Sequence, residues 1–167
     1  GDKLKSAYDA VVVGGGPSGA TAAAVLARAG WRIAVVEKAQ FPRRKVCGEF
    51  ISATTWPLLR QLGVADALLQ VAGPRVRRFG VYAGATMVTS KLAQDFRHTI
   101  EGGRAVGREH LDTMLLQRAA ALGAQVFQPC VLSQFAASDD GYECLIVDKV
   151  TRRFRTLGAR LIIAAHG

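Results

Sequence analysis

Four glycines lie close together in the stretch VVVGGGPSGA, residues 11–20, and three of them have the spacing G-x-G-x-x-G: Gly14, Gly16 and Gly19. In such a stretch the first glycine allows a sharp turn, the second lets the backbone approach a pyrophosphate, and the third lets a helix pack closely on a sheet. The N–H groups at the start of that helix, together with its dipole, attract phosphate. The residues therefore indicate binding of a dinucleotide, and a purely structural glycine-rich turn is the alternative.

The segments around these glycines are those that a dinucleotide-binding loop requires. Residues 8–13 predict a buried strand, residues 17–29 predict a helix that stops at Gly30, and residues 31–37 predict a second strand. Glu37 then follows the loop at roughly the 20-residue separation expected of a ribose-binding carboxylate. Such a carboxylate accepts hydrogen bonds from ribose hydroxyls and repels a 2′-phosphate, unless Glu37 is merely a surface residue. These residues indicate an adenosine diphosphate half and do not separate FAD from NAD.

The rest of the chain predicts further helices and strands. Helices are expected over 52–62, capped by Ser52 and disturbed by Pro57, over 65–71 and over 107–122. Strands are expected over 76–83, 86–93, 124–128, 131–137, 142–147, 153–156 and 159–165, the last of them buried, with an extended stretch over 96–106. The predicted fold class is α/β: one Rossmann-like domain over 1–167, with a mainly parallel sheet plus a small antiparallel β-meander.

Composition bounds the kind of protein. The chain has 167 residues, of which 50% are hydrophobic and 21% charged, as expected for one globular domain. No apolar run reaches the roughly 18 residues needed to cross a membrane. The cysteines are odd in number and widely spaced, which predicts neither a zinc site nor a redox dithiol and favours a reduced, cytoplasmic setting. They are Cys47, Cys130 and Cys144.

The net charge of +9 is concentrated in basic clusters at 43–45, 75–78 and 152–155. Such clusters fit an anionic ligand, a nucleic acid, an acidic membrane surface, or simply solvated faces. No aromatic interleaving or recognition motif supports nucleic acid as a partner. A peripheral membrane contact is left open.

Three further stretches carry a resemblance to a known family: FPRRKVCGEF after Glu37, GREHLDTML in the helix expected over 107–122, and RLIIAAHG at the end of the chain. Together with GGGPSG and VVEK, they resemble the FAD-dependent oxidoreductase superfamily of aromatic hydroxylases, geranylgeranyl reductases and flavin-dependent halogenases. The KVCGE stretch is most similar to the geranylgeranyl reductase branch. The resemblance covers essentially the whole chain, which would be the N-terminal FAD-binding portion of such a protein.

The resemblance implies FAD as the cofactor and a role for each matching residue. The loop residues Gly14, Gly16, Pro17, Ser18 and Gly19 would hold the pyrophosphate, and Glu37, with Lys38 beside it, would bind the adenosine ribose. The flavin side of the cofactor would be lined by Arg44, Lys45, Cys47 and Gly48. Arg108 would reach the ribityl-pyrophosphate region with Asp112 orienting its helix, and Val131 would offer backbone contacts to the adenine. The alternatives are a surface ion pair of Arg108 with Glu109 or Asp112, and a Cys47 that is only a small buried residue.

Two stretches depart from the superfamily pattern. Many relatives end this strand with Ala-Asp-Gly, whereas the chain has Ala165-His166-Gly167, and histidine does not supply the fixed negative charge of aspartate. A halogenase is expected to carry Gly-Glu-Ser shortly after a lysine, whereas here Cys47 intervenes and Phe50 replaces the serine, which argues against halogenation. Relatives also continue with a substrate-binding sheet and a later Gly-Asp motif, so we expect a fragment.

The expected function is that of an FAD-binding flavoprotein oxidoreductase, either an NAD(P)H-dependent reductase or a monooxygenase, acting on a hydrophobic small molecule. The KVCGE stretch favours the reductase. The alternative is a dinucleotide-binding module without chemistry of its own, and NAD as the ligand would give a colourless protein. No metal site is expected, and no general acid or base is assigned, because His98, His110 and His166 are isolated in sequence.

Overall fold

The computed structural model describes residues 7–46, 49–91 and 102–167. Its central sheet consists of β1 (Tyr8–Val13), β2 (Ile33–Val36), β8 (Gln125–Phe127), β9 (Cys130–Ser138), β10 (Gly141–Asp148) and β11 (Phe154–Ala164). The strand order is β8-β2-β1-β11-β10-β9. The first four strands in this order pair in parallel, and β9 and β10 form an antiparallel meander with β11. The predicted Rossmann-like α/β class is confirmed.

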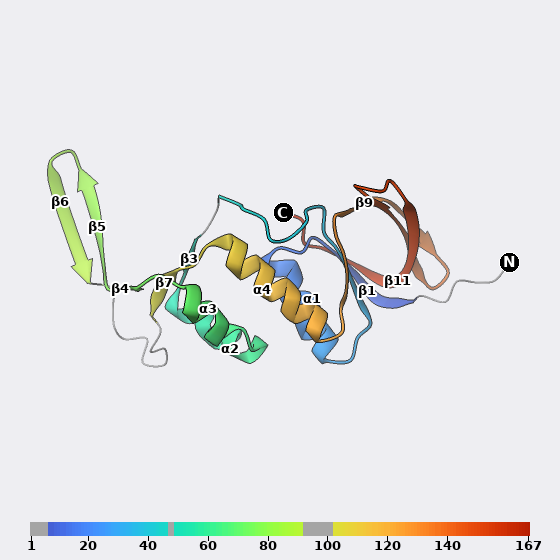
Figure 1. The fold of residues 1–167 in the computed structure, drawn as a ribbon, viewed down its shortest axis with the longest axis horizontal. Coiled ribbons are helices and arrows are strands. Elements are labelled where there is room, and N and C mark those ends of the chain that lie inside the picture. The colour runs from blue at the N-terminus through green and yellow to red at the C-terminus, as the bar shows by residue number, and fades with distance from the viewer. Residues whose placement is uncertain (1–6, 47–48, 92–101) are drawn as a thin grey trace.

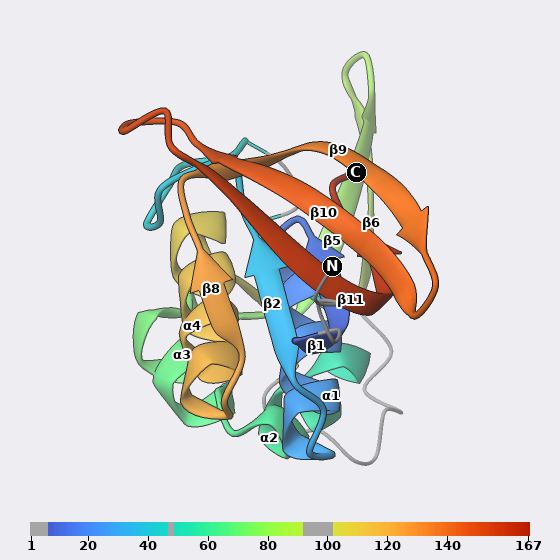
Figure 2. The same ribbon diagram turned by 90° about the vertical axis from the view of Figure 1, so that its right-hand side faces the viewer.

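The two faces of the sheet are covered by different structures. Helices α1 (Pro17–Arg28) and α4 (Arg108–Ala121) pack on one face, and the meander folds over the other (Figure 2). Because side chains alternate along a strand, Val12 of β1 packs with the helices and Val11 packs with the meander. The buried residues of α1 are all small, which lets the helix lie close to the sheet: Gly19, Ala20, Ala23, Ala24 and Ala27.

The last strand differs from the sequence-based expectation. The segments 153–156 and 159–165 were expected as separate strands, whereas β11 is continuous and changes partner at Ala159. Residues 154–159 pair with β10, and residues 159–164 pair with β1. The expectation of a buried strand over 159–165 is wrong, because Leu161 is 47% exposed and Ile162 and Ile163 are only partly buried. In the described part of the chain, no strand pairs with the second edge of residues 160–164.

A smaller layer of helices and short strands packs beside α4. The helix expected over 52–62 begins only at residue 56, as α2 (Trp56–Leu62), and Pro57 lies in its first turn, where its missing N–H costs no hydrogen bond. Ser52 does not cap a helix; its hydroxyl bonds those of Thr54 and Thr55. This layer comprises α2 (Trp56–Leu62), preceded by a 3₁₀ turn (Ala53–Thr55), α3 (Ala65–Val71), β3 (Phe50–Ile51), β4 (Arg75–Val76) and β7 (Gly103–Ala105).

The hairpin of β5 (Arg78–Ala83) and β6 (Thr86–Lys91) projects away from the central sheet, at the left of Figure 1. Every residue of both strands is exposed. The expected strand over 76–83 is split between β4 and β5, and the parts of the expected segments 86–93 and 96–106 that fall within 92–101 lie outside the described residues. Among the described helices, none has both the length and the apolar character needed to cross a bilayer.

Candidate cofactor-binding site

A cleft of about 920 Å³ opens where β1 and β2 end and α1 begins. This is the edge of a parallel sheet at which α/β proteins bind their ligands. Most of the residues predicted from the sequence line it: Gly14, Gly16, Pro17, Ser18, Glu37, Lys38, Lys45, Arg108 and Val131. Cys47 and Gly48 lie outside the described residues. The structure thus brings together side chains from segments that are far apart in the sequence.

The three glycines of the motif meet different physical constraints. Gly14 has a positive φ of 109°, and a Cβ there would lie 2.5 Å from the carbonyl oxygen of Ala165. Gly19 does not line the cleft; a Cβ on it would lie 1.9 Å from the carbonyl oxygen of Gly14. Gly16 has an ordinary φ of −68°, and within the described chain, its own neighbours aside, the nearest atom to its Cβ would be Nη2 of Arg43 at 4.0 Å. The fold therefore requires Gly14 and Gly19, whereas Gly16 leaves open space inside the cleft.

The start of α1 faces this open space. Gly16 is the residue before the helix, and Pro17 occupies its first turn. In the described chain no side chain caps this end, and the first turn contains no acidic residue. The first N–H groups of a helix lack partners within it and carry partial positive charge. This end of α1 is therefore suited to a bound anion.

Glu37 is buried and held by the backbone. Glu37 as a whole is only 4% exposed, so the alternative that it is a surface residue is wrong. Oε2 accepts a hydrogen bond of 2.6 Å from the N–H of Gly15, and Oε1 accepts one of 2.8 Å from the N–H of Ala39. Each carboxylate oxygen has a second lone-pair site. Glu37 therefore retains acceptor capacity for hydroxyl groups at the cleft.

Asp112 is buried beside α1 and pairs with two arginines, of which Arg108 is buried and Arg43 is partly exposed. Arg108, only 9% exposed, donates from Nε to Oδ1 of Asp112 at 2.7 Å and from Nη2 to Oδ2 at 3.0 Å. Arg43 places Nη2 3.3 Å from the same Oδ2. The alternative expectation was a surface ion pair of Arg108 with Glu109 or Asp112. It is right that Arg108 pairs with Asp112 and wrong that the pair lies on the surface, because both residues are buried. Sequence reasoning missed Arg43, whose only signal was its place in the basic stretch FPRRKV.

Arg44 lies elsewhere. Its side chain is 90% exposed and its Nε lies 3.4 Å from Oε2 of Glu109. It lines a separate pocket of about 520 Å³ between the loop around residue 43 and α4, and it does not line the cleft. A role for Arg44 along the flavin side stays a prediction.

The far side of the cleft is formed by the start of β9 and the end of the chain. Cys130 and Val131 line it there, together with His166. Burial, followed by the nearby Asp148 carboxylate, raises the pKa of the Cys130 thiol, so the group stays protonated at neutral pH. A protonated thiol is a poor nucleophile. Among the described residues, no cluster of histidine, cysteine, aspartate and glutamate fits a metal ion.

Known proteins resemble this chain in sequence and in fold. The chain is 45% identical to a menaquinone reductase from Mycolicibacterium smegmatis, over 98% of this chain and 38% of that protein. It is 32% identical to a 1H-pyrrole-2-carbonyl peptidyl-carrier-protein chlorinase from Pseudomonas fluorescens, over 96% of this chain and 39% of that protein. A geranylgeranyl bacteriochlorophyll reductase-like structure from Thermoplasma acidophilum has a TM-score of 0.78 at 24% identity, over 96% of this chain and 39% of that one.

The chain thus spans about two fifths of the length of these relatives. Solved flavin-dependent halogenases and monooxygenases also have this fold. The model of the FAD binding domain matches residues 7–167. The chain therefore belongs to the FAD-binding-domain family of flavoproteins, as the sequence resemblance implied.

Proposed function

We propose that this chain is the FAD-binding part of an NAD(P)H-dependent flavoprotein reductase that acts on a hydrophobic small molecule. The observation that supports an FAD site is the open space in front of Gly16. Neither the backbone conformation at residue 16 nor the packing of the described residues requires a glycine there. A bound pyrophosphate would explain the glycine, because any Cβ would stand between the phosphates and the backbone.

Each part of the cleft has a task in this proposal. The N–H groups at the start of α1 would bind the pyrophosphate, and Glu37 would accept hydrogen bonds from the adenosine ribose. Arg43 and Arg108 would supply positive charge beside the phosphates. FAD supplies the hydride-transfer chemistry when bound, and the protein supplies its position and the exclusion of water. Lys45 and Val131 line the same cleft and would contact the rest of the cofactor.

The 45% identity to a menaquinone reductase over almost the whole chain supports a reductase with a lipid-like quinone as its class of substrate. The 32% identity to a chlorinase supports the superfamily, while Phe50, where halogenases are expected to have serine, argues against halogenation. NAD(P)H as the reductant and a cytoplasmic setting belong to the same proposal. A peripheral membrane contact also belongs to it, and exposed apolar side chains of the β5–β6 hairpin, such as Phe79 and Val81, support it.

A second candidate is a dinucleotide-binding module with no chemistry of its own. It is favoured by the surroundings of Glu37 and Cys130, the acidic and thiol side chains that line the cleft among the described residues. Both carboxylate oxygens of Glu37 accept backbone hydrogen bonds, and the Cys130 thiol is held protonated. In this candidate FAD would bind and would not be reduced by NAD(P)H.

The visible absorption spectrum of the purified chain tests both candidates. Anaerobic protein is titrated with FAD, freed of excess ligand, and then mixed with NADPH or NADH and finally with a soluble naphthoquinone. Flavin bands near about 370 and 450 nm that stay with the protein, bleach with the nicotinamide and return with the quinone are the expected result. Retained bands that do not bleach would favour the non-catalytic module. A colourless protein after desalting would contradict the FAD site.

A further inference from the structure

Asp112 is an unusual place for a charge, because it is fully buried in the first turns of α4. Removing a carboxylate from water is costly unless cations and hydrogen bonds replace its hydration. Here two guanidinium groups do so, one from the loop after β2 and one from α4 itself. We call these three residues the Arg43–Asp112–Arg108 cluster.

The two arginines reach the cluster from different elements and both line the cleft. Arg108 is the first residue of α4, where the helix dipole disfavours a cation, and Asp112 one turn later offsets this cost. Arg43 is held on its other side by the ring of Phe41, with Cζ 4.7 Å from the ring centroid. Both side chains are thereby restrained before any ligand arrives.

The position of Arg43 relates the cluster to the glycine loop. Among the described residues, apart from the chain neighbours of Gly16, Nη2 of Arg43 is the atom nearest to where a Cβ of residue 16 would stand, at 4.0 Å. The lining of the cleft among the described residues carries cations at Lys38, Arg43, Lys45 and Arg108, and Glu37 is its one acidic side chain. Asp112 itself lies behind the arginines and does not line the cleft.

We infer that Asp112 is a positioning residue that holds Arg43 and Arg108 in place for the pyrophosphate of the cofactor. The inference rests on the proposed FAD site and adds two things to it: a phosphate contact by Arg43 and an indirect role for Asp112. Because both guanidinium groups are restrained, less side-chain entropy is lost when the phosphates bind. A merely structural Asp112 would tie the loop to α4 without affecting phosphate affinity.

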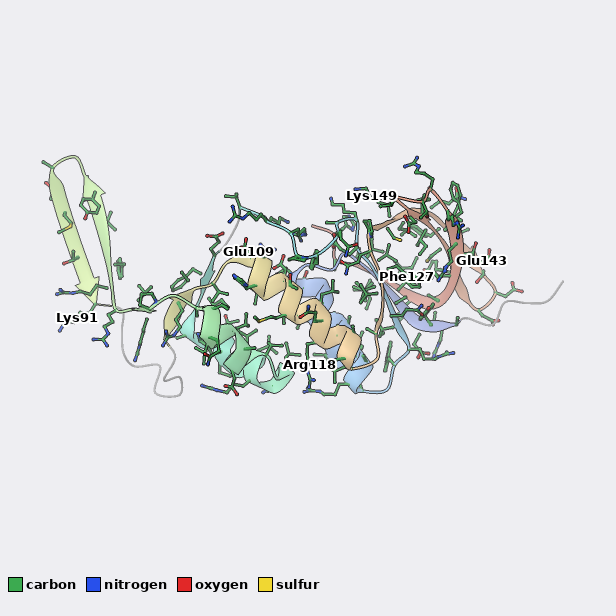
Figure 3. All side chains as sticks on the ribbon, viewed as in Figure 1. Lys91, Glu109, Arg118, Phe127, Glu143 and Lys149 are labelled. Atoms are coloured by element: carbon green, nitrogen blue, oxygen red, sulfur yellow. The ribbon has the colours of Figure 1, made fainter. Side chains whose placement is uncertain are left out.

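The test compares Asp112→Asn with Glu109→Gln. Both variants remove one negative charge from the start of α4, where Figure 3 labels Glu109, but Glu109 pairs with Arg44 and does not line the cleft. FAD affinity is measured by quenching of flavin fluorescence, and the thermal unfolding of each apoprotein is recorded separately. We expect Asp112→Asn to weaken FAD binding about 10- to 100-fold, the range for a lost charged hydrogen-bond partner, and Glu109→Gln to change it less than about twofold.

A second set of variants separates positioning from structure. In an Arg43→Met background only Arg108 remains to be positioned, so Asp112→Asn should cause a smaller loss of FAD affinity there than in the wild type. Asp112 keeps its two hydrogen bonds from Arg108 in this background, so the Arg43→Met protein is expected to fold. Asp112→Glu should restore part of the affinity that Asp112→Asn loses.

The outcomes are distinct. Asp112→Asn protein that binds FAD as tightly as the wild type overturns the inference, and so does a loss that persists in full in the Arg43→Met background. Wild-type protein that fails to bind FAD contradicts the proposed function itself.

Discussion

Gly16 and Gly19 belong to one motif, yet the structure predicts opposite consequences when each is replaced by alanine. At Gly16 the backbone is extended and the Cβ would enter open space, 4.0 Å from the nearest described atom apart from its chain neighbours. At Gly19 the Cβ would lie 1.9 Å from the carbonyl oxygen of Gly14, which is backbone and is not relieved by a change of rotamer. We expect Gly16→Ala to lose ligand affinity and Gly19→Ala to lose stability.

The magnitudes follow from these distances. For Gly16→Ala, poorer capping of α1 costs about 1 kcal/mol, and reduced entropy of the unfolded chain returns about 0.4–1 kcal/mol, so stability hardly changes. A methyl group between phosphate and backbone removes one or more charge-assisted hydrogen bonds, about 1.5–3 kcal/mol each, or roughly 10- to 150-fold in affinity. For Gly19→Ala, helix propensity improves by about 1 kcal/mol. Ordinary overpacking typically costs about 1–3 kcal/mol, and the overlap with the backbone of Gly14 costs more than that, so the net effect is a loss of stability.

The assay pairs FAD titration by fluorescence quenching with thermal unfolding of the apoprotein. A net loss of 1 kcal/mol in a domain of this size lowers Tm by about 2–4 °C. Gly73→Ala is the matched control, because its Cβ would lie 3.6 Å from Ala105, an ordinary contact, outside the cleft. If Gly16→Ala binds FAD as tightly as the control does, the argument that Gly16 is reserved for a pyrophosphate is refuted.

Three further predictions concern single side chains. Glu37→Ala should weaken FAD binding by about 1–3 kcal/mol and lower Tm, because ribose hydroxyls and two backbone N–H groups lose their acceptor; unchanged affinity in a fluorescence titration would remove Glu37 from the ribose site. Backbone hydrogen bonds to the Asp148 carboxylate lower its pKa, so the stability it adds is complete above its unfolded pKa of about 3.9 and is lost as pH falls through the lower folded value. Wild type and Asp148→Asn should therefore converge in urea stability in that acid range, and a difference that stays constant to about pH 2 would count against this assignment. Burial raises the pKa of both the Cys130 and Cys144 thiols, so mass spectrometry should find them alkylated by iodoacetamide at neutral pH only after unfolding, and rapid labelling of the native chain would contradict their burial.

Most of the β1-α1-β2 unit could be predicted from the sequence because its determinants are local. The apolar run over 8–13, the glycine spacing and the stop at Gly30 each act within a few residues of the structure they specify. The same holds for α4 and for the hairpin that joins β9 to β10. The nine predicted site residues that line the cleft were identified from motifs of this local kind and from the family resemblance that they carry.

Other features depend on contacts between distant segments, and the tertiary structure alone decided them. The change of partner at Ala159 in β11 requires both β1 and β10 to be in place. Arg43 meets Asp112 only because the loop after β2 folds over α4, and no local pattern marks that ion pair. Gly14 has a positive φ, and the additional constraint on it, the close approach of Ala165, comes from the other end of the chain. Short-range sterics and periodicity specify which elements form, whereas long-range packing determines which of their charges become buried and which face the cofactor cleft.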